Sequence, residues 1–301
     1  MSDQPTVTVA VDTDLDSTYD DSDAWSYATS LSSSVEKYKW ENGRRYHSYR
    51  EGAYNFPNDE KEQDRLDMNH HLCLLLLDNE LHFTELPQDR SIRILDIGTG
   101  TGIWAMEMGD KFPNAQVIGN ELSPIQPRWV PPNVQFEIDD AESPWPPREP
   151  FDFIHIRYML GSIQNWPRLL RQSYENLTPG GWIELQDFNT LAYSEDGSAA
   201  DDNKILEFCQ DAGFVNVRHE VRKVPIDTWA RDKKLKQIGA LYRLNLEELL
   251  EAALLGLLVR VENWKPEEVN VFIAQIRTAL KDKSVHVMQE FHVVWAQKPE
   301  K

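Results

Sequence analysis

The chain has 301 residues, of which 41% are hydrophobic, and this is enough for one α/β domain with a buried core and some attachments. Its 31 lysines and arginines stand against 50 aspartates and glutamates, so the formal net charge is −19. A surface this acidic repels phosphate groups, which argues against direct binding to nucleic acid or to an anionic membrane.

The cysteine content and the hydropathy pattern favour a reducing compartment, either the cytoplasm or the nucleus. The two cysteines, Cys73 and Cys209, show no motif spacing, as expected where disulfides do not form. The N-terminal residues are polar and acidic, without the apolar segment of a signal peptide. The longest apolar stretch, residues 249–259, contains Glu251 and is too short to span a bilayer.

Two segments are expected before the main domain. Residues 1–38 are rich in Asp, Ser and Thr, and we expect disorder because they cannot bury enough apolar surface to offset their ordering entropy. Residues 39–90 begin with aromatic and basic side chains, and Asp59 is then a suitable N-cap for an amphipathic helix. The expected helix covers residues 60–83. Its apolar face contains Leu66, His70, Cys73, Leu74, Leu77 and Leu81.

Strands and helices alternate in the third segment, residues 91–301. Seven strands are expected, at residues 92–97, 116–119, 134–137, 151–156, 181–185, 214–224 and 285–295. Helical patterns lie between them, for example at residues 103–111 and 167–177. This alternation predicts a Rossmann-like α/β fold, with a seven-stranded, mostly parallel sheet and helices on both faces. A helical insertion is expected at about residues 228–282.

The first expected strand runs into a glycine loop, Gly98-Thr99-Gly100-Thr101-Gly102, and a helix follows. Glycines permit the tight turn and let a ligand lie against the backbone. Dinucleotide enzymes use the spacing G-x-G-x-x-G, whereas Ile103 stands here in place of the third glycine. Asp96, two residues before the loop, would repel a pyrophosphate. It favours a ligand that carries ammonium and sulfonium groups, such as S-adenosylmethionine.

Acidic residues also end the next two expected strands. Glu121 lies 21 residues after Gly100, where a carboxylate can accept both ribose hydroxyls. Asp140 can hold the exocyclic amine of adenine, and Ala141 leaves room for the ring. Ligands bind at the carboxyl ends of adjacent strands in open α/β sheets. The alternative is that these are ordinary turn residues, because Asp and Gly are common in turns.

Other polar residues admit two interpretations, and we assign no catalytic residue. His155 is a candidate base, but it lies in mid-strand and is alternatively a core histidine with a hydrogen-bond partner. Arg157 and Tyr158 end the fourth strand, where we expect contact with the cofactor or the acceptor unless they only pack. Asp187 ends the fifth strand and could face the acceptor. We expect no metal, because three neighbouring residues lack the spacing of a standard site: His70, His71 and Cys73.

Several stretches of the chain, one of which contains the glycine loop, carry a resemblance. They are residues 43–49, 58–60, 63–67, 96–104, 122–127, 155–157, 161–163 with Trp166, and 179–184. Together they resemble the fungal LaeA-like methyltransferases over nearly everything after residue 40. The resemblance implies a class I methyltransferase fold, S-adenosylmethionine as the cofactor and a role in fungal secondary metabolism.

Two departures from this family pattern bear on function. Between Asp187 and Gly213 the chain looks short, and a helical segment that would help to form the acceptor pocket is missing. The N-terminal segment is acidic, so no basic cluster supports import into the nucleus. One hypothesis is therefore a tailoring enzyme that methylates a small secondary metabolite. The other is a regulatory methyltransferase subunit that acts with a protein partner and has weak or self-directed activity.

A cover for the acceptor pocket is expected from two pieces of the chain. The first is residues 46–83, which contain Tyr49 and Tyr54, and the second is the insertion at residues 228–282. Excluding water would sharpen electrostatic interactions and hold an acceptor in line. Leu250, Leu254 and Leu257 form an apolar face on the insertion that would pack onto the same sheet edge, or simply into a core.

Overall fold

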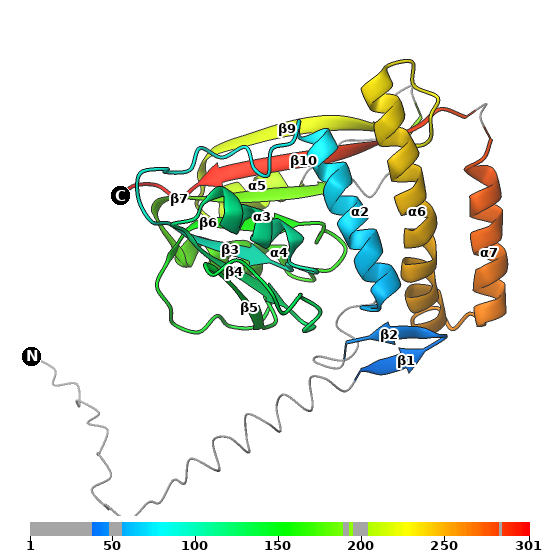
Figure 1. Ribbon diagram of the computed structural model, residues 1–301, viewed down its shortest axis with the longest axis horizontal. Coiled ribbons are helices and arrows are strands. Elements are labelled where there is room, and N and C mark those ends of the chain that lie inside the picture. The colour runs from blue at the N-terminus through cyan, green and yellow to red at the C-terminus, as the bar shows by residue number, and fades with distance from the viewer. Residues whose placement is uncertain (1–37, 48–55, 189–192, 195–203, 283–284) are drawn as a thin grey trace, which may run out of the picture.

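The structure, a computed structural model, describes residues 38–47, 56–188, 193–194, 204–282 and 285–301 (Figure 1). The expectation of disorder in residues 1–38 therefore falls, apart from Tyr38, outside the described residues. Tyr49 and Tyr54, which were expected to belong to the pocket cover, also lie outside them.

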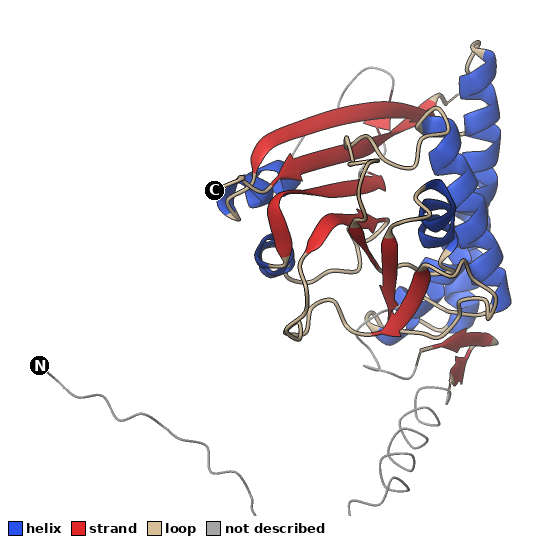
Figure 2. Ribbon diagram, turned by 60° about the vertical axis from the view of Figure 1, so that its left-hand side comes forward, coloured by secondary structure: helices blue, strands red, loops and turns tan. Residues whose placement is uncertain are grey.

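A mixed sheet forms the centre of the molecule (Figure 2). Its strands among the described residues are β3 (Arg93–Ile97), β4 (Gln116–Glu121), β5 (Val134–Ile138), β6 (Phe151–Arg157), β7 (Leu177–Phe188), β8 (Tyr193–Ser194), β9 (Val215–Pro225) and β10 (Val287–Gln297). The order across the sheet is β5-β4-β3-β6-β7-β10, and both β8 and β9 pair with β10. Strands β3 to β7 pair in parallel, whereas β10 is antiparallel to its neighbours. All seven expected strands are confirmed, and the two-residue β8 is additional.

Helices cover both faces of this sheet, as the alternating pattern predicted. The covering helices are α3 (Ile103–Lys111), α4 (Trp166–Glu175) and α5 (Lys204–Asp211). Successive side chains of a strand point to opposite faces, and β3 shows the consequence. Ile94 is buried in the cluster of α3, with Trp104, whereas the next residue, Leu95, is buried with Leu169 of α4. The sheet is therefore the middle layer of three.

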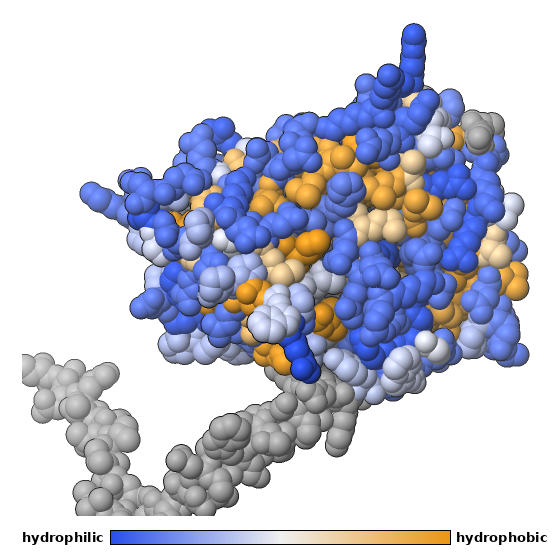
Figure 3. Space-filling model, in the orientation of Figure 1, coloured by the Kyte–Doolittle hydropathy of each residue, from blue (hydrophilic) through white to orange (hydrophobic). Residues whose placement is uncertain are grey.

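A helical layer stands beside the sheet in Figure 1. It contains α2 (Glu60–Leu76), α6 (Lys233–Arg260) and α7 (Pro266–Ala279), and α6 packs between the other two. The hairpin of β1 (Lys39–Glu41) and β2 (Arg44–Tyr46) joins this layer through Arg260, whose Nε lies 2.7 Å from Oε2 of Glu41. In the view of Figure 3, polar side chains cover much of the molecular surface, in keeping with the high acidic content of the chain.

The boundaries of α2 follow from its terminal residues. Asp59 is the N-cap as expected, because its side chain accepts the N–H of Glu62 at 3.1 Å. The helix ends well before residue 83, since Asp78 and Asn79 adopt left-handed backbone angles, with φ of 58° and 66°. A pattern of apolar spacing cannot reveal such a stop when no glycine or proline marks it.

The apolar face of the insertion packs differently from one expectation. Leu250 and Leu254 of α6 lie against a small cluster that contains Val269 and Ile273 of α7, and Leu257 is largely exposed. The two insertion helices thus bury these leucines against each other rather than on the sheet edge, because α6 already meets the rest of the molecule through α2 and β9. No described helix combines the length and apolar character needed to cross a membrane.

Candidate functional site

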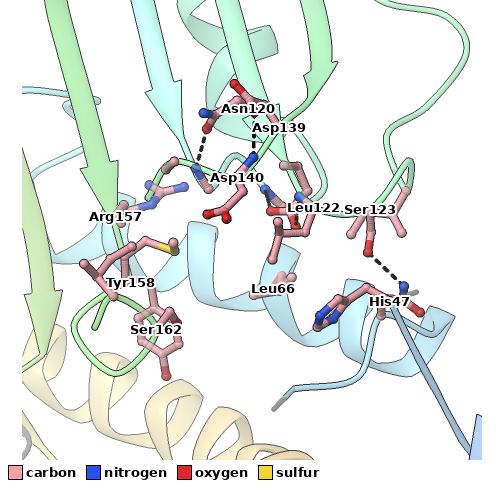
Figure 4. Close-up of a pocket in the computed structure, with 18 of the residues that line it drawn as sticks. His47, Leu66, Asn120, Leu122, Ser123, Asp139, Asp140, Arg157, Tyr158 and Ser162 are labelled. Atoms are coloured by element: carbon pink, nitrogen blue, oxygen red, sulfur yellow. Dashed lines mark hydrogen bonds between the residues drawn. The ribbon is translucent and has the colours of Figure 1, made fainter. Parts of the chain in front are cut away.

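A pocket lies at the carboxyl ends of β3, β4, β5 and β6 (Figure 4). Six of the nine residues expected to bind a cofactor line it: Gly98, Gly100, Glu121, Asp140, Ala141 and Arg157. The other three, Asp96, Thr99 and Gly102, lie outside its wall. In Figure 4, Arg157 and Tyr158 lie on one side of the pocket, and His47 and Ser123 lie on the other.

The glycine loop has a backbone that other residues rarely adopt. Gly100 has φ of 58°, and a Cβ built on it would meet only Leu66, at 3.5 Å, so open space remains beside this part of the backbone. Gly102 has φ of 81°, and a Cβ there would overlap the ring of Phe136. Gly100 therefore leaves room for a ligand, whereas Gly102 allows the loop to pack on β5.

Glu121 is the last residue of β4, and its side chain holds the glycine loop in place through hydrogen bonds. Its Oε2 accepts the backbone N–H of Gly100 at 3.1 Å, and its Oε1 accepts the N–H of Leu122 at 2.8 Å. Burial raises the pKa of Glu121, although these two N–H groups lower it. Each carboxylate oxygen has a second lone pair. Glu121 can therefore hold the loop and at the same time accept hydrogen bonds from the hydroxyl groups of a ligand.

Asp96 and His155 form a buried pair beneath the loop. Oδ1 of Asp96 lies 2.7 Å from Nδ1 of His155 on the neighbouring strand β6. The His155 ring has no exposed surface and stacks on Trp104 with ring centroids 3.7 Å apart. These contacts favour the interpretation of His155 as a core histidine over that of a base. They also give Asp96 a supporting position rather than one in the pocket wall.

Asp140 combines a turn with a position on the pocket wall. Its Oδ1 accepts the N–H of Glu142 at 2.9 Å, and its Oδ2 accepts the hydroxyl of Ser143 at 3.1 Å. These bonds are those of an Asp-initiated turn. The side chain nevertheless lines the pocket together with Ala141, so the two interpretations made from the sequence are compatible.

The turn after β6 brings several further groups to the pocket. Tyr158 has a left-handed backbone with φ of 61°, which is rare for a bulky residue and costs free energy. The guanidinium of Arg65 lies 5.5 Å from the centre of its ring, and burial raises the pKa of Tyr158 to about 12. The next residue, Met159, lies so close to the glycine loop that a Cβ on Gly98 would be 2.5 Å from its Sδ.

Asp187 holds this turn from the end of β7. Its Oδ2 accepts the N–H of Leu160 at 2.6 Å, and its Oδ1 accepts the N–H of Phe188 at 2.8 Å. Burial raises the pKa of Asp187 to about 7, although backbone N–H groups oppose the shift. Asp187 does not line the pocket, so its contacts are with the turn that carries Tyr158 and Met159 rather than with the space that an acceptor would fill.

The segment before the main domain contributes one wall of the pocket. The lining residues from it are His47, Pro57, Asn58 and Leu66. Asn58 is tied to the end of β4 because its Nδ2 donates to Oγ of Ser123 at 2.9 Å. All four residues lie within residues 46–83, the first piece of the expected pocket cover, although none of them belongs to a recognisable cofactor motif.

The insertion does not form a wall of this pocket among the described residues, which differs from the expected two-piece cover. It acts on the pocket through α2. Arg65 of α2 donates to Oδ1 of Asn245 at 3.2 Å, and Nζ of Lys61 lies 3.0 Å from carboxylate oxygens of Glu248 and Glu251. Helix α6 therefore braces the helix that carries Leu66.

No group of three or more His, Cys, Asp or Glu side chains in the described part of the chain is arranged to hold a metal ion. His70 and Cys73 are buried in α2, whereas His71 is exposed, so these three do not converge.

Known proteins are similar in sequence to this chain over most of its length. A family model described as a methyltransferase domain matches residues 68–253. The chain is 44% identical to methyltransferase PytC of Aspergillus terreus over 314 aligned positions, which cover 96% of each protein. It is 36% identical to a secondary metabolism regulator of Cochliobolus heterostrophus, over 86% of this chain and 94% of the relative. It is 33% identical to the protein-methionine methyltransferase LaeA of Emericella nidulans, over 86% and 76% respectively.

The PytC alignment also bears on the length of the chain. Its 314 positions exceed the 301 residues available here, so PytC has residues for which this chain has none. The short region expected at residues 187–213 lies partly outside the described residues, and the structure does not trace it as a whole.

Proposed function

The chain belongs to the methyltransferase-domain family and, within it, to the LaeA-like fungal methyltransferases, and we propose that it transfers a methyl group from S-adenosylmethionine to a small molecule in secondary metabolism. PytC, a methyltransferase similar to this chain over nearly its whole length, supports the enzymatic reading. The relatives named as regulators of secondary metabolism support the biological setting.

One observation carries the choice of cofactor. The carboxylates of Glu121 and Asp140, from neighbouring strands, meet the backbone of Gly98 and Gly100 in a single pocket. Carboxylates suit the hydroxyl groups and the amine of an adenosine, and bare glycine backbone suits the close approach of its side arm. The open space beside Gly100 is the place where a side chain would exclude such a ligand.

We assign the individual residues on this basis. Glu121 accepts hydrogen bonds from the ribose, while Asp140 and Ala141 hold the adenine. Gly98 and Gly100 offer their backbone to the rest of the cofactor, and Arg157 binds at the far side. Three residues act indirectly by shaping the loop: Asp96, Thr99 and Gly102. We also propose that the chain divides into an acidic N-terminal segment at residues 1–38, an aromatic segment and helical cap at residues 39–90, and a methyltransferase domain at residues 91–301.

The chemistry of methyl transfer requires little beyond positioning. When bound, S-adenosylmethionine supplies an electrophilic methyl group on a sulfonium. The chain holds the acceptor in line and excludes water, and a base is needed only if the acceptor carries a proton. Tyr158, Ser162 and Ile163 line the side of the pocket on which we place the acceptor. We assign no catalytic base.

The direct test uses purified protein, cofactor labelled in the methyl group and a fungal metabolite extract. A labelled small molecule that forms only with active protein is the expected result. A matched reaction with the Glu121→Ala variant should give much less of it. Capture of transcriptional regulators without any labelled product would instead favour a regulatory subunit that acts through a protein complex.

A second candidate acceptor lies inside the chain. The thioether of Met159 lies against Gly98 in the pocket, and a relative in Emericella nidulans is named a protein-methionine methyltransferase. Transfer to Met159 would form one sulfonium as the other is lost, so charge balances and no proton is released. This reading joins the regulatory hypothesis, in which methyl transfer is directed to the protein itself.

Labelled cofactor without any extract separates this candidate from the first. The peptide that contains Met159 should gain the mass of one methyl group and a permanent positive charge. The Met159→Leu variant should lose the label and retain cofactor binding, because leucine keeps the apolar volume. A label at another residue, or an unlabelled protein, would rule out Met159 as the acceptor.

A further inference from the structure

Three side chains from three elements form a line that ends at the pocket. Nη2 of Arg157, at the end of β6, lies 2.8 Å from Nδ1 of His70 in α2. Nε2 of the same histidine lies 3.0 Å from Oε2 of Glu107 in α3. His70 is almost fully buried, whereas Arg157 lines the pocket. The imidazole therefore connects a partly exposed carboxylate to a cation in the pocket wall.

The contact with Arg157 determines the protonation state of His70. A guanidinium can only donate hydrogen bonds, so Nδ1 of His70 must accept and carries no proton. The single ring proton is then on Nε2, which faces Glu107. Burial, together with the positive charge of Arg157, lowers the pKa of His70 to about 3. The ring is thus neutral over the whole physiological range.

The charge of Arg157 stands out among its neighbours in the pocket. Four described lining residues are acidic: Glu121, Asp139, Asp140 and Glu142. Arg157 is the only lysine or arginine among the described lining residues, and no described carboxylate forms an ion pair with it. A neutral histidine holds the guanidinium in place without neutralising its charge, so the charge remains available to a ligand.

We propose that Arg157 binds the α-carboxylate of the methionine part of the cofactor, and that His70 is the residue that positions it. This rests on the proposed function, since it assigns one end of the same ligand. An arginine can bind a carboxylate through two parallel N–H donors, which fixes direction as well as distance. His70 directs one edge of the guanidinium, and the free edge faces the pocket. Glu107 lies close to Nε2 of His70 but forms no hydrogen bond with it.

The test compares two ligands that differ only in the carboxylate. S-adenosylmethionine and decarboxylated S-adenosylmethionine are titrated against the full-length protein by calorimetry. The His70→Leu variant removes the acceptor at similar volume, and His70→Asn restores an acceptor oxygen close to the position of Nδ1. His71→Leu, on the exposed neighbouring residue, is the matched control.

We expect His70→Leu to weaken binding of S-adenosylmethionine by roughly tenfold, the effect of one charge-assisted hydrogen bond. Binding of the decarboxylated ligand should not change, and His70→Asn should recover most of the loss. Arg157→Leu should show the same selectivity, and adding His70→Leu to it should cause little further loss, because the two residues act as a unit.

Equal losses for both ligands would show that His70 only supports the fold, and would overturn the proposal. Unchanged binding of both ligands in His70→Leu and Arg157→Leu would also overturn it. Failure of the wild-type protein to bind either ligand would be a different result, because it would refute the proposed function itself.

Discussion

Oγ1 of Thr99 donates a hydrogen bond to Oδ2 of Asp96 across 2.6 Å, beneath the glycine loop. The other oxygen of Asp96 contacts His155, so one buried carboxylate joins the loop to the two central strands. From the sequence we expected Asp96 to lie beside the positive charges of a cofactor. In the structure Asp96 is 3% exposed, so its main effect on the site is through the shape of the loop.

Removal of this carboxylate should lower stability and cofactor affinity together. Asp96→Ala leaves two buried polar partners, Thr99 and His155, without an acceptor, at about 1–3 kcal/mol each. Thr99→Val removes only the bond to the loop and should cost about 1 kcal/mol. Urea unfolding measures both effects. A variant Asp96→Ala that is fully stable yet fails to bind cofactor would indicate direct contact with the ligand instead.

The second and third glycines of the loop, Gly100 and Gly102, should respond differently to alanine. Gly102→Ala forces a side chain into the Phe136 ring at a left-handed backbone, so we expect a clear fall in the melting temperature. Gly100→Ala meets open space and costs only the backbone strain, about 1 kcal/mol, but it occupies the space assigned to the ligand. Melting curves and calorimetric titration of both variants separate the roles. Equal stability losses with equal binding would contradict the assignment.

The contribution of Asp187 to the free energy of unfolding depends on pH. The pKa of Asp187 rises from 3.8 to about 7 on folding, so between these values the folded protein keeps a proton that the unfolded chain has released. Its contribution to stability therefore decreases as pH rises through this range, by about 1.4 kcal/mol per pH unit, and is constant above it.

The Asp187→Asn variant isolates this contribution because it does not titrate. The unfolding free energy of the wild-type protein minus that of the variant should be greatest at about pH 5 and should fall toward about pH 7. Urea unfolding of both proteins across this range gives the difference. A wild-type-minus-variant difference that stays constant or rises with pH would show that Asp187 is already ionised in the folded protein.

Most of the fold could be predicted because its signals are local. Helix α3 was expected at residues 103–111 and is observed there, since a glycine loop and an apolar periodicity mark its start and its face. Strand β7 was expected at residues 181–185 but covers Leu177–Phe188, because pairing with β6 and β10 extends it through Pro179, Gly180 and Gly181. Pairing partners are not visible in the sequence of one strand.

The site could be predicted only where a motif carries it. Glu121, Asp140 and the glycine loop follow strand ends, and parallel strands bring those ends together. His47, Asn58 and Leu66 join the pocket through packing of a separate segment, which no motif reports. The pairing of His70 with Arg157 spans 87 positions and joins α2 to the end of β6, so it could not be predicted from the sequence.

Ligand binding should also protect the segment before the domain. Amides at residues 44–47 and 58–66 should exchange more slowly with S-adenosylhomocysteine bound, because His47, Asn58 and Leu66 line the pocket. Helix α7 packs on α6, and its exchange should not change. Hydrogen exchange with mass spectrometry compares the free and bound protein. Protection confined to the glycine loop would mean that the segment before the domain does not cover the ligand.

Calorimetric titration of the purified protein with S-adenosylhomocysteine, with NAD as the comparison ligand, decides whether this pocket is the cofactor site. We expect one site for S-adenosylhomocysteine and none for NAD. We also expect an affinity loss of tenfold or more in Glu121→Ala, from about 1.5–3 kcal/mol for a charged hydrogen bond. Glu149→Ala, at a largely exposed carboxylate, should bind as the wild type does. No binding of S-adenosylhomocysteine, or full affinity in Glu121→Ala, would contradict the assignment of this pocket.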